Sequence, residues 1–270
     1  MELSLREAAN IKHKKTISLC LFAALLIFLQ TNNYLLLSIW GVCAVYLFVT
    51  SDKLLRLFVL TSILFGIGFF TYLQVNSQLK LEPRELHIFL NRLSLFFILL
   101  PLFAFSFFYK VPFVRYWKKP QWNEFICFPF IWSGFHQTKV KSFLLIALTI
   151  NFFIFLPFII LNGWSFIQEV WLLTIIFTIT NAVLEELVWR GALLSRFSEQ
   201  LGERWAVVIT SLGFGLQHYS LGFPWSVCIG FTLGGLFYGG ITIKSGSIFP
   251  SLIWHMVLNV LMVFSGFIFS

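Results

Sequence analysis

Apolar residues occupy most of the chain in long continuous runs, and polar residues gather in the short gaps between them. A helix that crosses a bilayer needs about 20 mostly apolar residues. The pattern therefore predicts an all-α fold, a polytopic transmembrane helix bundle with about eight to nine spans. The runs cover residues 16–30, 34–50, 54–75, 93–109, 142–162, 170–195, 204–221, 225–243 and 247–268.

The composition excludes several function classes. Hydrophobic residues make up 59% of the 270 residues and charged residues only 11%, against roughly 25% charged in an average soluble domain. A soluble core of this size cannot bury so much apolar surface. The composition therefore argues against a soluble enzyme, a nucleic-acid-binding module or a disordered regulator. The four cysteines are scattered in or beside apolar runs, and their spacing predicts neither a metal site nor a disulfide framework.

The net charge of +8 also fits a membrane protein, because Lys and Arg lie in the gaps between apolar runs. On one side of the membrane the connecting segments hold only Lys80, Arg84 and Arg92, and the opposite side holds most of the remaining basic residues. The positive-inside rule then places the N-terminus in the cytoplasm. The first run has no small-residue cleavage site after it, so we expect a retained first helix rather than a cleaved signal peptide. The expected partner is the lipid bilayer and not a nucleic acid.

The two halves of the chain differ in character. Residues 1–141 form an N-terminal transmembrane region that ends in a basic, aromatic inner loop, from Lys110 to Lys141. The pattern of this loop is typical of an interfacial segment, with a role in substrate docking as the alternative. In residues 142–270 polar residues enter the apolar runs, so we expect the functional core there.

Two adjacent acids, Glu185 and Glu186, lie inside the apolar run over residues 170–195. An ionisable residue at membrane depth is costly and is therefore a candidate for function. Glu186 and Arg190 have the i,i+4 spacing of a helical ion pair, in the favoured orientation. Glu185 points about 100° away from Glu186 around the helix axis. This spacing predicts a structural role for Glu186 and makes Glu185 the candidate for a catalytic role.

Two histidines, His218 and His255, also lie in apolar runs, and Asn259 shares a helix face with His255. Glu185 and His218 lie about 16–17 residues on either side of a turn near residues 201–202, at roughly 25 Å from it. Glu185, His218, His255 and Asn259 are four polar groups on three helices of an apolar bundle, and such a set predicts one common site.

The four side chains suit hydrolysis of a peptide bond. A carboxylate and a histidine can activate a water molecule, and a His–Asn pair can donate hydrogen bonds to the developing oxyanion. The alternative is a zinc site with Glu185, His218 and His255 as ligands. The residues alone leave both mechanisms open. HExxH, GxSxG and P-loop motifs are absent from the sequence.

The three motifs Glu185-Glu186-x-x-x-Arg190, Phe214-x-x-x-His218 and His255-x-x-x-Asn259, in this order, resemble those of the CPBP family. This family comprises CAAX prenyl endopeptidases of the Rce1 type and bacteriocin-processing or self-immunity proteins. The resemblance covers about residues 170–262. It implies that Glu185 is the catalytic glutamate, that His218 is its partner, and that the third motif forms the oxyanion hole. It further implies a metal-free mechanism, so no cofactor is expected, with zinc as the alternative. Glu186, Arg190 and Phe214 are assigned a supporting role.

The sequence thus predicts a multi-pass intramembrane endopeptidase of the CAAX-protease-like type. Its expected substrate is a membrane-associated protein or peptide. Two alternatives remain at this point: a non-catalytic membrane immunity or scaffold protein, and a proton-coupled transporter. The lack of internal repeats argues against the transporter.

Overall fold

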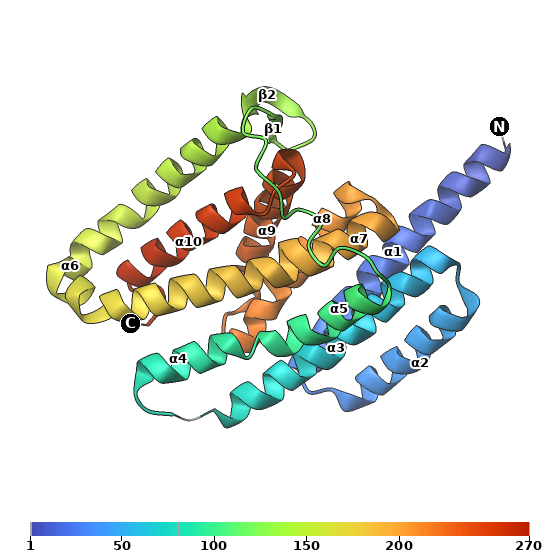
Figure 1. Ribbon diagram of the computed structural model, residues 1–270, viewed down its shortest axis with the longest axis horizontal. Coiled ribbons are helices and arrows are strands. Elements are labelled where there is room, and N and C mark those ends of the chain that lie inside the picture. Colours follow the sequence, from blue (N-terminus) through green and yellow to red (C-terminus); the bar gives the residue numbers. More distant parts are fainter. Residues whose placement is uncertain (1, 80, 270) are drawn as a thin grey trace. The chain divides into compact units, whose positions relative to one another are not determined.

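The computed structural model describes residues 2–79 and 81–269, with the side chains of residues 2–12 left aside. Most of the described residues are helical, and they also include one small two-stranded antiparallel sheet (Figure 1). The all-α fold expected from the sequence is confirmed. The elements are α1 (Glu2–Gln30), α2 (Tyr34–Thr50), α3 (Lys53–Gln78), α4 (Arg84–Leu93), α5 (Phe96–Phe108), β1 (Phe125–Pro129), β2 (Gly134–Lys139), α6 (Val140–Glu186), the π-helix η1 (Leu187–Leu193), α7 (Leu194–Leu201), α8 (Glu203–Gln217), the 3₁₀-helix η2 (His218–Leu221), α9 (Trp225–Ser245) and α10 (Phe249–Phe264).

Five helical segments among the described residues are long and apolar enough to cross a membrane. Two shorter apolar helices, α2 and α10, accompany them. The chain is therefore an integral membrane protein, and its span count is roughly consistent with the expected one. Lys80, which the sequence analysis placed on the outer side, lies outside the described residues. The long spans are His13–Gln30, Lys53–Gln78, Arg84–Phe108, Val140–Leu201 and Trp225–Ser245.

The chain divides into two compact units, each built from segments distant in sequence. Unit 1 contains Met1–Gln74, Phe97–Phe113 and Ala192–Leu236. Unit 2 contains Val75–Phe96, Val114–Gly191 and Phe237–Ser270. The functional division at residue 141 stays a prediction.

The core of unit 1 is a cluster of phenylalanine rings from α1, α3 and α7. Phe197 of α7 contacts Phe22 at 5.2 Å and Phe58 at 4.7 Å between ring centroids, and Phe22 lies 5.2 Å from Phe65. All four side chains are fully buried. Offset and edge contacts of this kind add to the burial of apolar surface. The cluster therefore joins the first helix to the helix that follows the predicted catalytic segment.

Glycines bring α8 and α9 close together within unit 1. A Cβ atom on Gly235 would lie 2.9 Å from the Cα atom of Ser211, and one on Gly215 would lie 2.5 Å from the carbonyl oxygen of Cys228. Only a residue without a side chain permits this approach. The contact holds the end of α8, where His218 begins the following 3₁₀-helix.

In unit 2, the long helix α6 consists of two arms that meet at Gly163. This residue has φ 75° and ψ 175°, a conformation that glycine adopts readily, and Figure 1 shows the chain reversing there. Helix α10 packs against α6, as does α4. An apolar core between these helices includes Ile88 of α4, Phe177 of α6 and Val263 of α10. The second arm of α6 carries the two adjacent glutamates at its C-terminal end.

The basic loop before α6 contains a β-hairpin that the sequence analysis did not predict. Strands β1 and β2 pair antiparallel, and Phe125 opposes Lys139. Hydrogen bonds from the backbone N–H of Gln121 to the carbonyl oxygen of Ser245 and from that of Ile248 to the carbonyl oxygen of Tyr116 hold the preceding segment to the turn between α9 and α10.

Candidate active site

Glu185 and Glu186 end α6, and both are buried in the apolar interior of unit 2. The following seven residues, Leu187–Leu193, form a π-helix rather than an α-helix. Short π-helical segments are rare and occur frequently at functional sites. The backbone thus departs from regular geometry directly after the two acids.

Glu186 is the centre of a buried polar cluster. Its Oε1 atom accepts a hydrogen bond from Nη1 of Arg190 at 2.9 Å and lies 3.0 Å from Nδ1 of His255. Arg190 is 1% exposed, so the ion pair that the i,i+4 spacing predicts exists and is fully buried. A carboxylate can only accept in these contacts, so the Nδ1 atom of His255 donates. The hydrogen bond fixes the plane of the imidazole ring and directs Nε2 elsewhere.

The Nε2 atom of His255 faces the other glutamate. It lies 3.7 Å from Oε2 of Glu185, and Oε1 of Glu185 lies 3.9 Å from Nη1 of Arg92. Both distances exceed a direct hydrogen bond, so these two contacts are electrostatic. One imidazole therefore stands between the two carboxylates, with one ring nitrogen toward each.

Arg92 is a component of this site that the sequence analysis assigned wrongly. The sequence places Arg92 in an outer connecting segment before the apolar run over residues 93–109, but the candidate span covers Arg84–Phe108 and Arg92 lies inside it, 7% exposed. Its Nη1 atom donates to Oδ1 of Asn181 at 2.8 Å, and its Nε atom donates to Oδ1 of Asn91 at 2.9 Å. Asn181 precedes Glu185 by one helical turn, so the polar residue within the apolar run was the signal that a partner from another helix approaches this face.

Tyr238 is a second component of the site that the sequence analysis missed, and no pattern in the sequence points to it. Its ring stacks on the His255 ring, with centroids 5.4 Å apart, and the guanidinium of Arg190 lies 5.0 Å from the centre of the same ring. A cation over an aromatic face is stabilised by the ring's quadrupole. Tyr238 of α9 therefore packs against both partners of Glu186.

Asn259 lies one turn after His255 on α10 and is 4% exposed. Among the residues that the structure describes, its Nδ2 atom has no hydrogen-bond partner. A buried amide donor in this state is costly, so a group that accepts a hydrogen bond there would be stabilised.

His218 and Phe214 belong to unit 1. The Nδ1 atom of His218 lies 2.7 Å from the carbonyl oxygen of Phe214 and must donate to it, because a carbonyl only accepts. The imidazole stacks on Phe231 with centroids 3.7 Å apart and an interplanar angle of 13°. The second motif thus orients the histidine: the residue four positions earlier holds Nδ1, and Nε2 becomes the nitrogen that can accept a proton.

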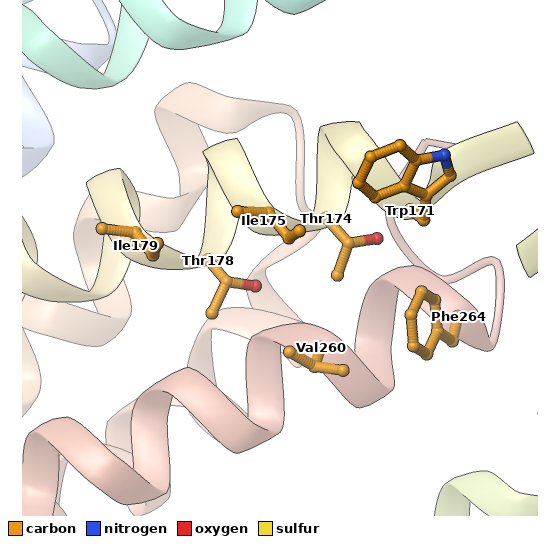
Figure 2. A pocket seen from close by; sticks show the side chains of 7 residues that line it. All are labelled: Trp171, Thr174, Ile175, Thr178, Ile179, Val260 and Phe264. Atoms are coloured by element: carbon orange, nitrogen blue, oxygen red, sulfur yellow. The ribbon is translucent and has the colours of Figure 1, made fainter. Parts of the chain in front are cut away.

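An apolar groove lies beside the cluster of unit 2, between the second arm of α6 and α10 (Figure 2). Its volume is about 300 Å³. Thr178 of the groove precedes Glu185 by two helical turns, about 10 Å, and Val260 follows Asn259 directly. An apolar segment of a bound molecule that lies in the groove would therefore have one end about two helical turns from the two glutamates. The lining residues are Trp171, Thr174, Ile175, Thr178, Ile179, Val260 and Phe264.

Within either unit, the described residues contain no group of three or more His, Cys, Asp or Glu side chains arranged to hold a metal ion. The predicted zinc ligands Glu185, His218 and His255 are divided between the two units. In unit 2 the two carboxylates already face two guanidinium groups, those of Arg92 and Arg190.

The fold and the buried polar cluster define an integral membrane protein with ionisable groups at membrane depth. Residues 167–261, about a third of the chain, match the family model of the type II CAAX prenyl endopeptidase Rce1-like proteins. Every residue of the three motifs lies within the match, whereas Arg92 lies outside it. Comparison with curated proteins and with solved structures gave no match.

The first prediction concerns the ion pair of Glu186. Replacing Glu186 by Ala strands the guanidinium of Arg190 in the apolar interior, which we expect to lower the free energy of unfolding by about 3–5 kcal/mol. The Asp52→Asn variant is the control, because the ion pair of Asp52 with Lys14 is partly exposed and such pairs contribute about 0–1 kcal/mol. Thermal unfolding in detergent measures both. A fully stable but inactive Glu186→Gln protein would show that the roles of the two glutamates are reversed.

The second prediction is that Arg92 and Glu185 interact energetically. Arg92→Met should destabilise the protein because it removes the guanidinium that faces the buried carboxylate of Glu185 at 3.9 Å. In a Glu185→Gln background the same substitution should cost less, with a coupling free energy of about 0.5–3 kcal/mol. A double-mutant cycle of unfolding free energies measures this coupling. Additive effects of the two substitutions would contradict the pairing.

Proposed function

We propose that the protein is an intramembrane endopeptidase in which Glu185 activates water for attack on a peptide bond of a membrane-associated protein or peptide. The observation that carries this proposal is the different pairing of two adjacent buried glutamates. Glu186 is hydrogen-bonded to Arg190 and faces Nδ1 of His255 at 3.0 Å, whereas Glu185 faces Nε2 of His255 at 3.7 Å and Nη1 of Arg92 at 3.9 Å. A carboxylate at those distances from its neighbours can accept a proton from a water molecule.

His218 is the proposed partner of Glu185 in this step. Its Nδ1 donates to the carbonyl oxygen of Phe214, so Nε2 can accept a proton. The account requires that Glu185 and His218 meet at one water molecule. The match over residues 167–261, which includes both residues, supports this assignment.

The proposed oxyanion site uses α10. Asn259 offers a buried amide N–H, and Nε2 of His255 lies one turn away on the same helix face. His255 can donate from Nε2 only when the ring carries a second proton, because Nδ1–H is directed to Glu186. Two donors aimed at one oxygen would stabilise the tetrahedral intermediate.

The apolar groove between α6 and α10 supports a membrane-associated substrate. Its walls are mostly apolar (Figure 2), and Thr178 in one wall precedes Glu185 on α6 by about two helical turns. A substrate segment that enters the groove from the bilayer would need hydrogen bonds from the protein for its backbone polar groups, because lipid supplies none.

The proposed mechanism is metal-free. Arg92 and Arg190 match the two carboxylates of unit 2 in charge, so the cluster carries no net negative charge to attract a divalent cation. We also propose that the N-terminus lies in the cytoplasm, which the distribution of Lys and Arg supports.

The third prediction is loss of proteolysis in variants of the two water-activating groups. Glu185→Gln and His218→Ala should each lower the cleavage rate by about 10²–10⁴ while the protein stays folded, because general-base catalysis is lost. Each form is expressed at an equal level in cells, and the termini of the proteins in their membranes are labelled and quantified. This measurement detects cleavage of any membrane protein of the cell. Glu169→Gln is the matched control, since Glu169 is an exposed glutamate on the same helix.

New termini should appear with the wild type and with Glu169→Gln and be missing with the two site variants. Identical terminus profiles for all four forms would sink the endopeptidase assignment. They would favour a non-catalytic scaffold or immunity function or proton transport.

The fourth prediction concerns metal. Cleavage of a substrate found in that way should survive exhaustive chelation and metal-free purification, because the proposed step uses only side chains. Metal analysis of the active enzyme accompanies a chelation time course. Stoichiometric zinc, with activity lost on chelation and restored by zinc, would replace the metal-free mechanism by one with zinc ligands.

A further inference from the structure

The β-hairpin β1–β2 is attached directly to the end of a membrane span. Strand β2 ends at Lys139, and the span of α6 begins at Val140. The backbone N–H groups of Val140 and Lys141 donate to the carbonyl oxygens of Glu124 and Trp122, at 2.8 and 3.2 Å. The hairpin is therefore fixed at the N-terminal end of α6, as Figure 1 also shows.

The hairpin combines buried and exposed apolar side chains. Ile126 and Ile131 are buried, and a Cβ atom on Gly240 of α9 would collide with the Ile131 side chain, so the hairpin packs closely on α9 of unit 2. The hairpin also exposes four aromatic rings: Phe125 at 53%, Phe128 at 44%, Phe130 at 70% and Phe135 at 85%. Phe128 and Phe135 contact each other edge to face, with centroids 5.9 Å apart. An exposed apolar patch of this kind marks a surface that is covered by a partner.

Charge indicates what the partner is. Residues 110–141 contain six Lys and Arg and a single acid, Glu124. Lys118, Lys119, Lys139 and Lys141 are all exposed. Exposed phenylalanines next to lysines at the end of a membrane span combine insertion beneath the headgroups with attraction to anionic lipid.

We propose that this hairpin is a membrane-surface anchor: its four exposed Phe side chains insert into the interface of the bilayer, and the neighbouring lysines bind anionic lipid headgroups. The preceding segment is hydrogen-bonded to the turn between α9 and α10 through Ser245 and Ile248. The anchor therefore fixes the depth at which α10, which carries His255, enters the bilayer. This inference does not depend on the protein being a peptidase.

The test places an environment-sensitive fluorophore on the patch. In a form whose four native cysteines are replaced, Phe130→Cys and, in a second variant, Phe135→Cys are labelled with a nitrobenzoxadiazole dye and placed in nanodiscs. Asn123→Cys, an exposed polar position in the same segment, is the control. The discs contain phosphatidylcholine alone or with phosphatidylglycerol. The readouts are quenching by aqueous iodide and by lipids that carry a nitroxide near the headgroup.

At positions 130 and 135 we expect blue-shifted emission, iodide quenching several-fold weaker than at position 123, and strong quenching by the nitroxide lipids. Phosphatidylglycerol should increase the protection, and Lys118→Gln with Lys119→Gln should remove that increase. Iodide access at positions 130 and 135 equal to that at 123 would overturn the anchor. Protection that is the same in both lipids would overturn the role of anionic headgroups.

Discussion

The structure of the candidate site depends on how one carboxylate, that of Glu186, is neutralised in an apolar interior. A charge at membrane depth must be paired and hydrogen-bonded, because the low dielectric makes an isolated ion very costly. Glu186 meets this requirement with Arg190 on its own helix and with His255 on α10. The same contacts join the end of α6, the π-helical turn and α10, and they set the orientation of the imidazole.

The pairing of Glu186 gives two neighbouring glutamates different properties. Adjacent residues on a helix point about 100° apart, so the two carboxylates meet different neighbours. Glu185 faces Nε2 of His255 and the guanidinium of Arg92. In the proposed function Glu186 is structural and Glu185 activates water, and the i,i+4 spacing of Glu186 and Arg190 predicts this division.

Much of this arrangement follows from local sequence. The apolar runs predicted the helices, the spacing of Glu186 and Arg190 predicted their ion pair, and the spacing of His255 and Asn259 placed them on one face of α10. Arg92 could not be found in this way, because a cation at the edge of an apolar run has the same pattern whether it flanks a span or lies within one.

Contacts between distant segments account for the other omissions. Tyr238 stacks on His255 through the packing of α9 on α10, which no spacing within one helix encodes. The β-hairpin before α6 exposes Phe125, Phe128, Phe130 and Phe135 together with polar residues of β2. Its sequence therefore lacks the regular alternation of apolar and polar residues that predicts a half-buried strand.

The central claim is that Glu185 of unit 2 and His218 of unit 1 act on one water molecule. An experimental structure in a lipid nanodisc tests it most directly. The account predicts one ordered water within hydrogen-bond distance of both the Glu185 carboxylate and Nε2 of His218, which requires those atoms to lie no more than about 6 Å apart. A structure in which His218 faces lipid or a separate cavity, while Glu185 contacts only Arg92 and His255, would contradict it.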